Sequence, residues 1–474
     1  MKHVTRIAFA LLMATCTAPA FSQKTFVLCS PDEKFQSEIK ISTTDIKYNI
    51  KHDGDLMLDF SRIHMSLDKG RAFGINPKLS GTKTKTVDRI LNADIYKKKE
   101  VRDNFNELTL KFKGNYRIVF RAYNEGIAYR FESDIKGDII VENELSEFNF
   151  LHDAKAYIPY VRDNVATLES QFGNPFENIY KYENISQWDT SRIAFLPLLV
   201  EGRNGKKLCI LEADLLNYPG MYLYNGDGSN TLKSVFAPYP KEIEQGGYLN
   251  LQGLVKSREP YIAKVSGVTS FPWRIMVVSE NDKELADNDM VFKLATRPQG
   301  DFSWVKPGKA AWEWWHAWNL LGVDFKTGIN NETYKCYIDF ASRYGVEYIL
   351  LDDGWSPKNE ADLFKVVPEL DLPELVRYGK ERNVGLILWA GYYPFDRDME
   401  SVCKYYSEMG IKGFKVDYME RDDQLMVDFH HRAAEVAAKY KLLLDLHGTY
   451  KPTGLQCTYP NVVNIEGVHG LEQM

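Results

Sequence analysis

Residues 24–297 alternate apolar and polar side chains with a period of two over many short segments. Clear examples are Ile39–Ile41, Leu108–Phe112, Tyr116–Phe120 and Ile127–Phe131. Because successive side chains of a strand point to opposite faces, this pattern predicts strands with one buried face. Gly, Asn and Asp separate the segments, and helical periods are rare. Residues 23–297 are therefore predicted to form one large β-sandwich domain.

The pattern changes at Ala310, where short apolar runs begin to alternate with stretches of helical period. Strands are predicted over residues 310–315, 347–352, 384–389, 413–417, 442–446 and 462–466. Helices are predicted over residues 331–344, 372–383, 397–409 and 423–440. Such alternation is typical of a parallel sheet with helices on its faces. The fold class is thus multidomain β plus α/β, with residues 298–309 as the linker.

Functional side chains gather where the predicted parallel strands end. These are Asp352, Trp389, Asp417, His447 and Glu466. Side chains at the carboxyl ends of successive strands are typical of a (β/α)8 barrel. Residues 310–474 supply about six of the eight strands that such a barrel needs. The sequence therefore predicts an incomplete barrel, either an open six-stranded variant or, as we favour, a fragment.

The N-terminal segment has the pattern of a secretory signal. Lys2 and Arg6 precede the apolar run Ile7–Ala14, and Ala18–Ala20 supplies small residues for cleavage. Residues 1–22 are predicted to be a signal peptide that exports the protein to the periplasm. A lipid anchor at Cys16 is a weaker alternative. No later run is long and apolar enough to predict a transmembrane helix.

Composition narrows the functional classes. Hydrophobic residues make up 44% of the chain and charged residues 26%, which predicts a globular protein. The net charge of −6 argues against a nucleic-acid partner. The aromatic content of 13% suits either a β-rich core or a cleft that stacks on sugars. Nothing in the sequence indicates an oligomeric state.

Acidic residues at the strand ends supply the pair of groups that glycoside hydrolysis needs. Asp417 ends one predicted strand, Glu466 ends another, and Glu472 follows closely. One carboxyl group attacks or activates water while the other protonates the leaving oxygen. A separation of ~5–5.5 Å gives retention, and ~6.5–9.5 Å gives inversion. Solvated surface charges are the alternative, above all for Glu472.

Further residues at the strand ends suit the binding of sugar hydroxyl groups and ring faces. Asp352, Asp353 and Trp355 follow one strand, and a helix cap with a core tryptophan is the alternative there. Lys415 lies two residues before Asp417, so both are predicted to share a strand face. Lys415 could bind a sugar hydroxyl and hold Asp417 ionised, or form an ordinary ion pair. The other predicted substrate-binding residues are Trp389 and His447.

Several segments together resemble one known family. They are Asn174–Tyr180, Glu212–Leu215, Tyr218–Met221, Leu351–Trp355, Gly413–Asp417, Lys451–Gly454, Thr458–Asn461 and Glu466–Gly470. The chain resembles glycoside hydrolase family 97, the exo-acting α-glucosidases and α-galactosidases of Bacteroidetes. The resemblance implies a β-super-sandwich, a catalytic (β/α)8 barrel, a small C-terminal β domain and an active-site Ca²⁺.

The resemblance also implies roles for individual residues. Inverting members of the family place a glutamate base just after the histidine of strand five, whereas Gly448 follows His447 here. Retaining members place an aspartate nucleophile at the end of strand four, where Asp417 stands. Glu472 is then implied as general acid/base. The implied Ca²⁺ ligands are Glu177, Glu466 and Glu472.

The sequence therefore predicts an exo-acting, retaining glycoside hydrolase. It would remove terminal α-linked galactose from oligosaccharides through a covalent glycosyl-enzyme intermediate. An α-glucosidase of the same family is one alternative. A catalytically inactive fragment, whose β-sandwich folds and binds sugar, is the other.

Overall fold

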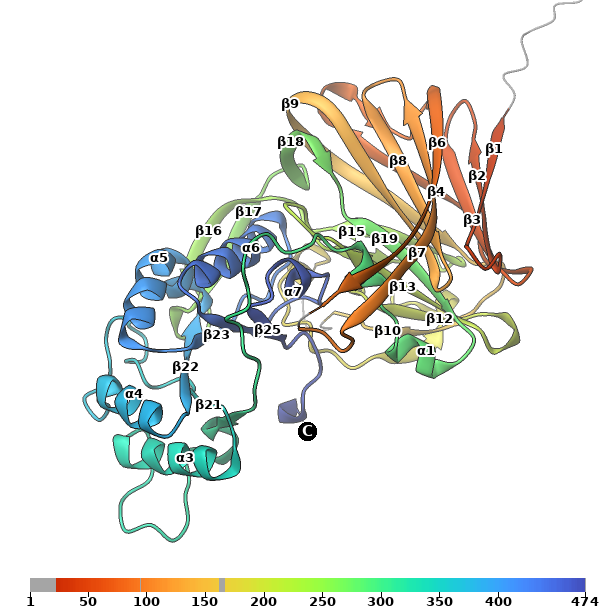
Figure 1. The fold of residues 1–474 in the computed structure, drawn as a ribbon. Coiled ribbons are helices and arrows are strands. Elements are labelled where there is room, and N and C mark those ends of the chain that lie inside the picture. The colour runs from red at the N-terminus through yellow and green to blue at the C-terminus, as the bar shows by residue number, and fades with distance from the viewer. Residues whose placement is uncertain (1–22, 94, 162–166, 474) are drawn as a thin grey trace, which may run out of the picture.

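The computed structural model describes residues 23–93, 95–161 and 167–473. The predicted signal peptide and Cys16 lie outside these residues. The described chain forms two halves, a β domain and a helix-covered parallel sheet, with the C-terminal end close to their junction (Figure 1).

The β domain is built on seventeen strands that hydrogen bonding joins into one folded-over antiparallel sheet. Its strands are β1 (Lys24–Cys29), β2 (Phe35–Ile41), β3 (Ile46–His52), β4 (Asp55–Leu67), β5 (Ala72–Phe73), β6 (Leu79–Asn92), β7 (Glu100–Phe112), β8 (Tyr116–Tyr123), β9 (Gly126–Asn149), β10 (Lys155–Ile158), β11 (Lys181–Asn184), β12 (Leu198–Glu201), β13 (Lys207–Ala213), β14 (Met221–Tyr224), β15 (Thr231–Phe236), β18 (Ala263–Ser270) and β19 (Trp273–Ser279). Strands β16 (Pro240–Gly246) and β17 (Gln252–Arg258) form a separate hairpin. The structure confirms the predicted β-sandwich.

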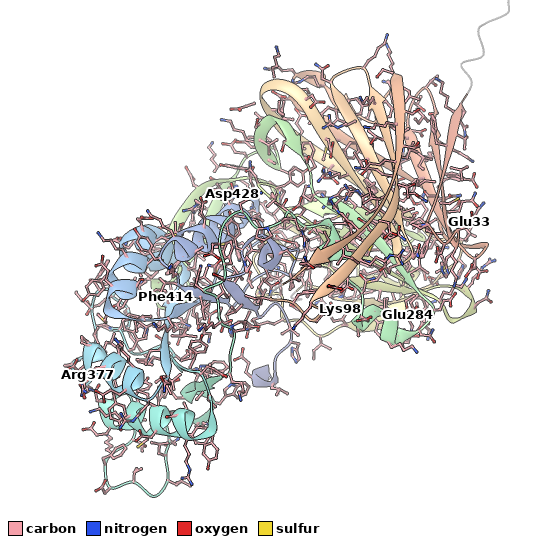
Figure 2. The ribbon with its side chains drawn as sticks, viewed as in Figure 1. Glu33, Lys98, Glu284, Arg377, Phe414 and Asp428 are labelled. Carbon is pink, nitrogen blue, oxygen red and sulfur yellow. The ribbon has the colours of Figure 1, made fainter. Side chains whose placement is uncertain are left out.

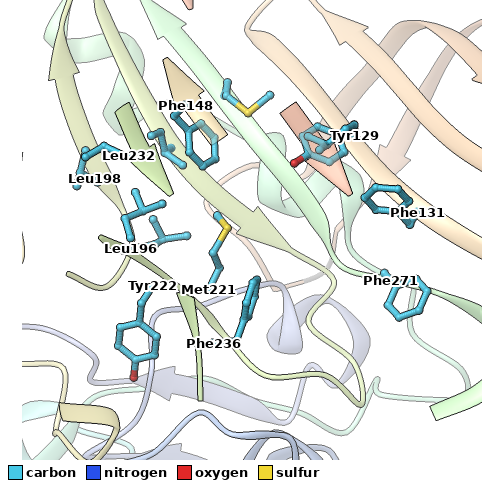
Figure 3. Packing of buried hydrophobic residues seen from close by; sticks show 14 of the residues in the cluster. Tyr129, Phe131, Phe148, Leu196, Leu198, Met221, Tyr222, Leu232, Phe236 and Phe271 are labelled. Atoms are coloured by element: carbon cyan, nitrogen blue, oxygen red, sulfur yellow. The ribbon is translucent and has the colours of Figure 1, made fainter. Parts of the chain in front are cut away.

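The period-two pattern of the sequence becomes the burial pattern of the strands. Side chains of β2 alternate between buried and half-buried along its whole length. The buried faces pack into one aromatic-rich core, part of which Figure 3 shows around Phe148, Met221 and Phe236. Tyr222 lies at the edge of this group, where its hydroxyl leaves the apolar core. Two short helices, α1 (Asp282–Ala286) and α2 (Met290–Leu294), close the domain.

The second half is a six-stranded parallel sheet whose strands pair in sequence order. Its strands are β20 (Ala310–Trp312), β21 (Tyr348–Leu351), β22 (Gly385–Gly391), β23 (Gly413–Asp417), β24 (Leu443–Leu446) and β25 (Val462–Ile465). Its helices are α3 (Asn331–Tyr344), α4 (Leu372–Glu381), α5 (Tyr392–Met409), α6 (Gln424–Lys439) and α7 (Leu455–Thr458). The sheet curls into a half-barrel with its helices outside (Figure 1), as the alternation predicted.

Several boundaries differ from the sequence prediction. The first strand ends at Trp312, because Glu313 begins a 3-10 turn with its carboxyl group buried. Strand β22 continues past Trp389 to Gly391. Helix α5 begins at Tyr392, five positions before the expected start. Pro394 lies in its first turn, where a missing N–H breaks no helical hydrogen bond.

The two halves meet through specific polar contacts. The Tyr222 hydroxyl of β14 donates to Asp422 Oδ1 at 2.9 Å, and the Asn174 N–H donates to the Glu420 carbonyl at 2.8 Å. Figure 2 labels Phe414, on β23 and packed against α5, and Asp428, on α6 near the β domain. The hairpin β16–β17 reaches from the β domain toward α5 and α6 (Figure 1). These contacts fix one domain over the strand ends of the other.

Within the described part of the chain, no helix combines the length and apolar character needed to cross a bilayer.

Candidate active site

A cavity of about 380 Å³ opens where the parallel strands end. The half-barrel contributes Asp352, Asp353, Trp389, Lys415, Asp417, His447, Glu466 and Glu472 to its lining. The β domain contributes Pro175, Glu177 and Tyr248. The structure thus brings every predicted site residue except Trp355 into one cavity, whose size suits a small ligand.

Asp417 ends β23, and three groups surround its carboxylate. Lys415 Nζ lies 3.8 Å from Oδ2, which also accepts a 3.2 Å hydrogen bond from Trp389 Nε1. The Tyr418 N–H donates to Oδ1 at 2.7 Å. Burial raises the pKa of Asp417 above its ordinary value, while Lys415, His447 and Trp389 oppose this effect. The shared strand face predicted for Lys415 and Asp417 is confirmed.

Lys415 connects Asp417 to the end of β21. Its ammonium group donates to Asp352 Oδ2 at 2.8 Å and lies 4.3 Å from the centre of a Trp312 ring. Trp312 Nε1 donates to the same Asp352 oxygen at 2.6 Å. Burial tends to lower the pKa of Lys415, but Asp352 and Asp417 outweigh it and raise this pKa. The cavity floor therefore carries a fixed ammonium group between two carboxylates.

His447 follows β24 and is held between two acids. Nε2 lies 3.1 Å from Asp445 Oδ1, and Nδ1 lies 3.1 Å from Glu466 Oε1. Burial disfavours the charged ring, yet the hydrogen bonds to Asp445 and Glu466 outweigh burial and raise the pKa of His447 to about 10. The ring is therefore an imidazolium at neutral pH.

Three glutamates from both domains converge at one side of the cavity. One oxygen from each of Glu177, Glu466 and Glu472 lies within 4.8 Å of the others. Burial raises the pKa of Glu177 to about 8, and the carboxylates of Glu466 and Glu472 add to this rise. Burial and Glu466 likewise raise the pKa of Glu472. Hard carboxylate oxygens at this spacing fit the ligand chemistry that Ca²⁺ prefers.

Trp355 corrects one sequence prediction. Its side chain is fully buried in the half-barrel core, and Nε1 donates to the Trp389 carbonyl at 2.8 Å. A buried indole offers no face to a sugar, so Trp355 is a packing residue. Asp353, from the same segment, does line the cavity, and burial raises its pKa.

Several residues of the site were not among the sequence predictions. Asp445 lies two positions before His447 on β24, so the alternation that linked Lys415 to Asp417 could have found it. The buried carboxyl group of Glu313 accepts the Asp352 N–H at 2.8 Å and the Tyr334 hydroxyl at 2.9 Å. Tyr248 lines the cavity from the β domain, and no local sequence pattern signals that position.

Comparison with known families decides the identity. The sequence model for "Glycosyl-hydrolase 97 N-terminal" matches residues 28–297, and that for "Glycoside hydrolase 97" matches residues 312–468. The chain belongs to glycoside hydrolase family 97. It is thus a glycoside hydrolase by family, and the cavity holds the carboxyl groups that such enzymes use.

Two curated relatives align with nearly the whole of this family 97 chain. A "Retaining alpha-galactosidase" of Bacteroides thetaiotaomicron is 52% identical over 471 residues, covering 99% of this chain and 71% of that protein. A "Probable retaining alpha-galactosidase" of Streptomyces bingchenggensis is 26% identical and covers 100% of this chain and 71% of that protein.

Solved structures share the family 97 fold. A "Glycoside Hydrolase Family 97 enzyme in complex with Acarbose" from Pseudoalteromonas has a TM-score of 0.80 at 22% identity, covering 94% of this chain and 70% of that one. A "beta-arabinopyranosidase" has a TM-score of 0.78 at 22% identity, covering 95% and 71%. At such identities the likeness concerns the fold alone, and different sugar specificities occur on it.

Proposed function

We propose that this family 97 chain is an exo-acting, retaining α-galactosidase that releases terminal α-linked galactose from oligosaccharides. The observation that carries the proposal is Asp417, which stands at the end of β23 beside Lys415 and lines the cavity. The position after His447 holds Gly448, so no carboxylate base for inversion stands there. The 52% identity to a protein named retaining alpha-galactosidase supports galactose as the sugar.

The reaction has two steps on this chain's own residues. In the first, a carboxylate oxygen of Asp417 attacks the anomeric carbon while Glu472 donates its proton to the glycosidic oxygen. The bond to the leaving sugar breaks, and an ester joins galactose to Asp417. In the second, Glu472 takes a proton from water, whose oxygen attacks the anomeric carbon and frees Asp417. Two inversions at that carbon return the α anomer.

The surrounding charges prepare Asp417 for this role. A nucleophile must be ionised, and burial alone would favour its neutral form. Lys415 and the His447 imidazolium supply positive charge that favours the carboxylate. Trp389 and the Tyr418 N–H fix its orientation through hydrogen bonds. Asp352 in turn holds Lys415 in place and lines the cavity, where it can accept sugar hydroxyl groups.

Ca²⁺ is proposed as the cofactor, held by Glu177, Glu466 and Glu472. When bound, the ion supplies a fixed positive charge that offsets the three converging carboxylates. A carboxyl group has two oxygens, so Glu472 can offer one to the cation and carry the transferable proton on the other. Glu177 belongs to the β domain, so the bound ion would also join the two domains.

Parallel assays on aryl α-galactoside and aryl α-glucoside test the sugar, and proton NMR of the first product tests the stereochemistry. We expect faster hydrolysis of the galactoside and initial release of α-galactose. Preference for the glucoside would favour the α-glucosidase alternative, and initial β-galactose would contradict retention. No turnover of either substrate would favour the inactive alternative.

Replacing Asp417 by Asn should lower kcat by more than about a hundredfold, because the amide cannot form the ester intermediate. Asp396→Asn, on α5, is the matched control and should keep wild-type turnover. Residual Asp417→Asn activity above roughly a hundredth of wild type would count against a nucleophile.

Chelation should lower turnover, and added Ca²⁺ should restore it. Calorimetric titration should show Ca²⁺ binding to the wild type and weaker binding to Glu177→Gln, which keeps the side-chain shape but loses the charge. Indifference of both activity and titration to a strong chelator would remove Ca²⁺ from the mechanism.

We also propose that residues 1–22 direct export to the periplasm. Fractionation of cells that express the full chain, or a chain lacking this segment, tests the localisation. Retention of the full chain in the cytoplasm would contradict it. Membrane association that Cys16→Ser abolishes would favour the lipid-anchor alternative.

A further inference from the structure

The lining of the active-site cavity changes in character from its floor to its rim. At the floor, Asp352, Trp389 and Lys415 are no more than 4% exposed. At the rim, the rings of Tyr248 and Trp314 are 52% and 42% exposed. Buried charges suit the hydroxyl groups of one enclosed sugar. Exposed rings suit the apolar C–H face of whatever extends outward from that sugar.

Tyr248 reaches this rim on the turn of the β16–β17 hairpin, and the half-barrel holds the hairpin directly after this turn. Leu251 is buried in the hydrophobic core of the half-barrel, and its carbonyl accepts the Tyr393 N–H at 2.9 Å. The next anchor is the Gly253 carbonyl, which accepts a hydrogen bond from Arg421 Nη1 at 2.6 Å. Tyr248 is therefore only three residues from Leu251, which is anchored to the half-barrel.

The turn itself is held in one conformation. Gln252 Oε1 accepts the Tyr248 N–H at 3.2 Å, and Gln245 Nε2 donates to the Asn250 carbonyl at 2.9 Å. Gly247 has a φ of +70°, and a Cβ there would lie 1.8 Å from Gln252 Oε1. Only glycine fits this position, so the turn presents the aromatic ring at little further cost in conformational entropy.

The tyrosine ring is supported on one side and open on another. Its centre lies 5.4 Å from that of Tyr418, which follows the predicted nucleophile directly. More than half of the residue remains exposed, although burying it in a core would stabilise the fold. A ring fixed beside the reacting centre but left open is suited to bind a partner there.

We propose that Tyr248 forms the binding face for the leaving sugar, the unit directly attached to the galactose that is cleaved off. This inference rests on the proposed function, because a leaving sugar exists only if the chain hydrolyses galactosides. The ligand class is a neutral pyranose whose axial C–H groups stack on the phenol ring. The β domain thus contributes to the choice of the oligosaccharide as well as to the proposed metal site.

The test compares two substrates that share galactose but differ in the leaving group. α-Galactosyl fluoride loses only fluoride, whereas a galactosyl disaccharide such as melibiose loses a second sugar. For Tyr248→Ala we expect the ratio of kcat/KM for melibiose to kcat/KM for the fluoride to fall about ten-fold, mainly through a higher KM. Tyr248→Phe keeps the ring and should keep the wild-type ratio.

Tyr344→Ala is the matched control, because Tyr344 is an exposed tyrosine on α3 that does not line the cavity. Its ratio should equal that of the wild type. An equal loss on both substrates in Tyr248→Ala, or no loss on melibiose, would overturn the proposal. A loss in Tyr248→Phe as large as in Tyr248→Ala would assign the effect to the hydroxyl group and also overturn stacking. A wild type that hydrolyses neither substrate would instead overturn the proposed function, and this inference with it.

Discussion

The carboxylate of Asp417 and the ammonium group of Lys415 share a buried position, and each influences the charge of the other. At 3.8 Å, and with the lysine only 4% exposed, solvent screens the pair weakly. Asp352 anchors the ammonium group from the opposite side, so Lys415 does not pivot away from the nucleophile. The ionisation of Asp417 therefore depends on Lys415 and Asp352 as well as on its own burial.

Replacing Lys415 by Met should shift the pH profile of kcat/KM. The folded pKa of Asp417 is already raised by burial, and loss of the nearby cation raises it further. The acid limb, where activity is lost as Asp417 takes up a proton, should move to higher pH by at least about one unit. The profile measured from pH 4 to 9 checks this. Lys439→Met, which alters an exposed pair with Glu400, should leave the limb in place. An unmoved limb in Lys415→Met would show that Lys415 does not set this ionisation.

The positions of some site residues could be predicted from the sequence, and those of others could not. Lys415 and Asp417 share a strand face because alternation is local, and that relation followed from the spacing alone. The burial of Trp355 could not be predicted in this way, because it depends on packing against β22, a strand that lies about thirty residues later in the chain. Glu177 entered only through family resemblance, since no local pattern indicates that a β-domain turn reaches the strand ends. Tyr248 had no signal at all for the same reason.

At the scale of elements, the helices of the half-barrel begin and end where local chemistry dictates. Helix α3 starts after Asn330, whose side chain accepts the Thr333 N–H, and stops at Gly345 with a left-handed backbone. Such caps can be recognised from sequence, so the predicted bounds of α3 are confirmed. Boundaries set by tertiary contacts, such as the early end of β20 at the buried Glu313, could not be recognised in this way.

Helix α6 contains a buried histidine that makes the fold sensitive to acid. The His430 Nδ1 lies 2.7 Å from the Met426 carbonyl, and Nε2 lies 2.6 Å from Thr449 Oγ1. Burial lowers the pKa of His430 to about 4. The neutral ring can satisfy both partners, because Nδ1–H donates to the carbonyl while Nε2 accepts from the hydroxyl. Protonation would reverse that second hydrogen bond, with Nε2–H donating to the hydroxyl oxygen, and would place a positive charge in the buried core.

His430→Gln should therefore make stability less dependent on pH. An unfolded histidine titrates near 6.5, so the stabilisation is present above that pH and is lost as pH falls toward 4. Between pH 7 and pH 5 the wild type should lose about 2 kcal/mol more unfolding free energy than the variant. Urea unfolding at the two pH values measures the difference. Equal losses in both proteins would contradict the assignment.

At the scale of the whole molecule, the site exists only because the two domains are docked. Glu177 and Tyr248 come from one domain, and the predicted nucleophile comes from the other. A buried polar seam holds them together. Lys451 Nζ lies 2.5 Å from Glu212, and Asp422 accepts the Tyr222 hydroxyl. The fold class could be predicted from the two hydrophobic periods, whereas this docking could not, because its contacts join residues hundreds of positions apart.

Gly220→Ala should disrupt that seam. A Cβ at this position would lie 2.1 Å from Asp422 Oδ2, and Asp422 is fully buried. We expect a loss of about 2–3 kcal/mol in unfolding free energy and a marked fall in turnover. Gly81→Ala is the control, since its Cβ would meet nothing within 4 Å. Thermal unfolding and activity of both variants check the prediction. Wild-type behaviour of Gly220→Ala would show that the interface adapts.

The 24-residue strand β9 has a consequence for the time course of folding. It pairs with β4, β8, β15, β18 and β19, so it joins segments that lie far apart in the chain. Such non-local pairings slow folding, since the intervening loops must close before the contacts form. During synthesis, β9 leaves the ribosome long before β18 and β19. The segments of β9 that pair with these two strands therefore stay unpaired until the strands are made. The β domain should therefore complete late, and nascent chains stopped before Trp273 should be prone to aggregation while those released after Ser279 can close their sheet.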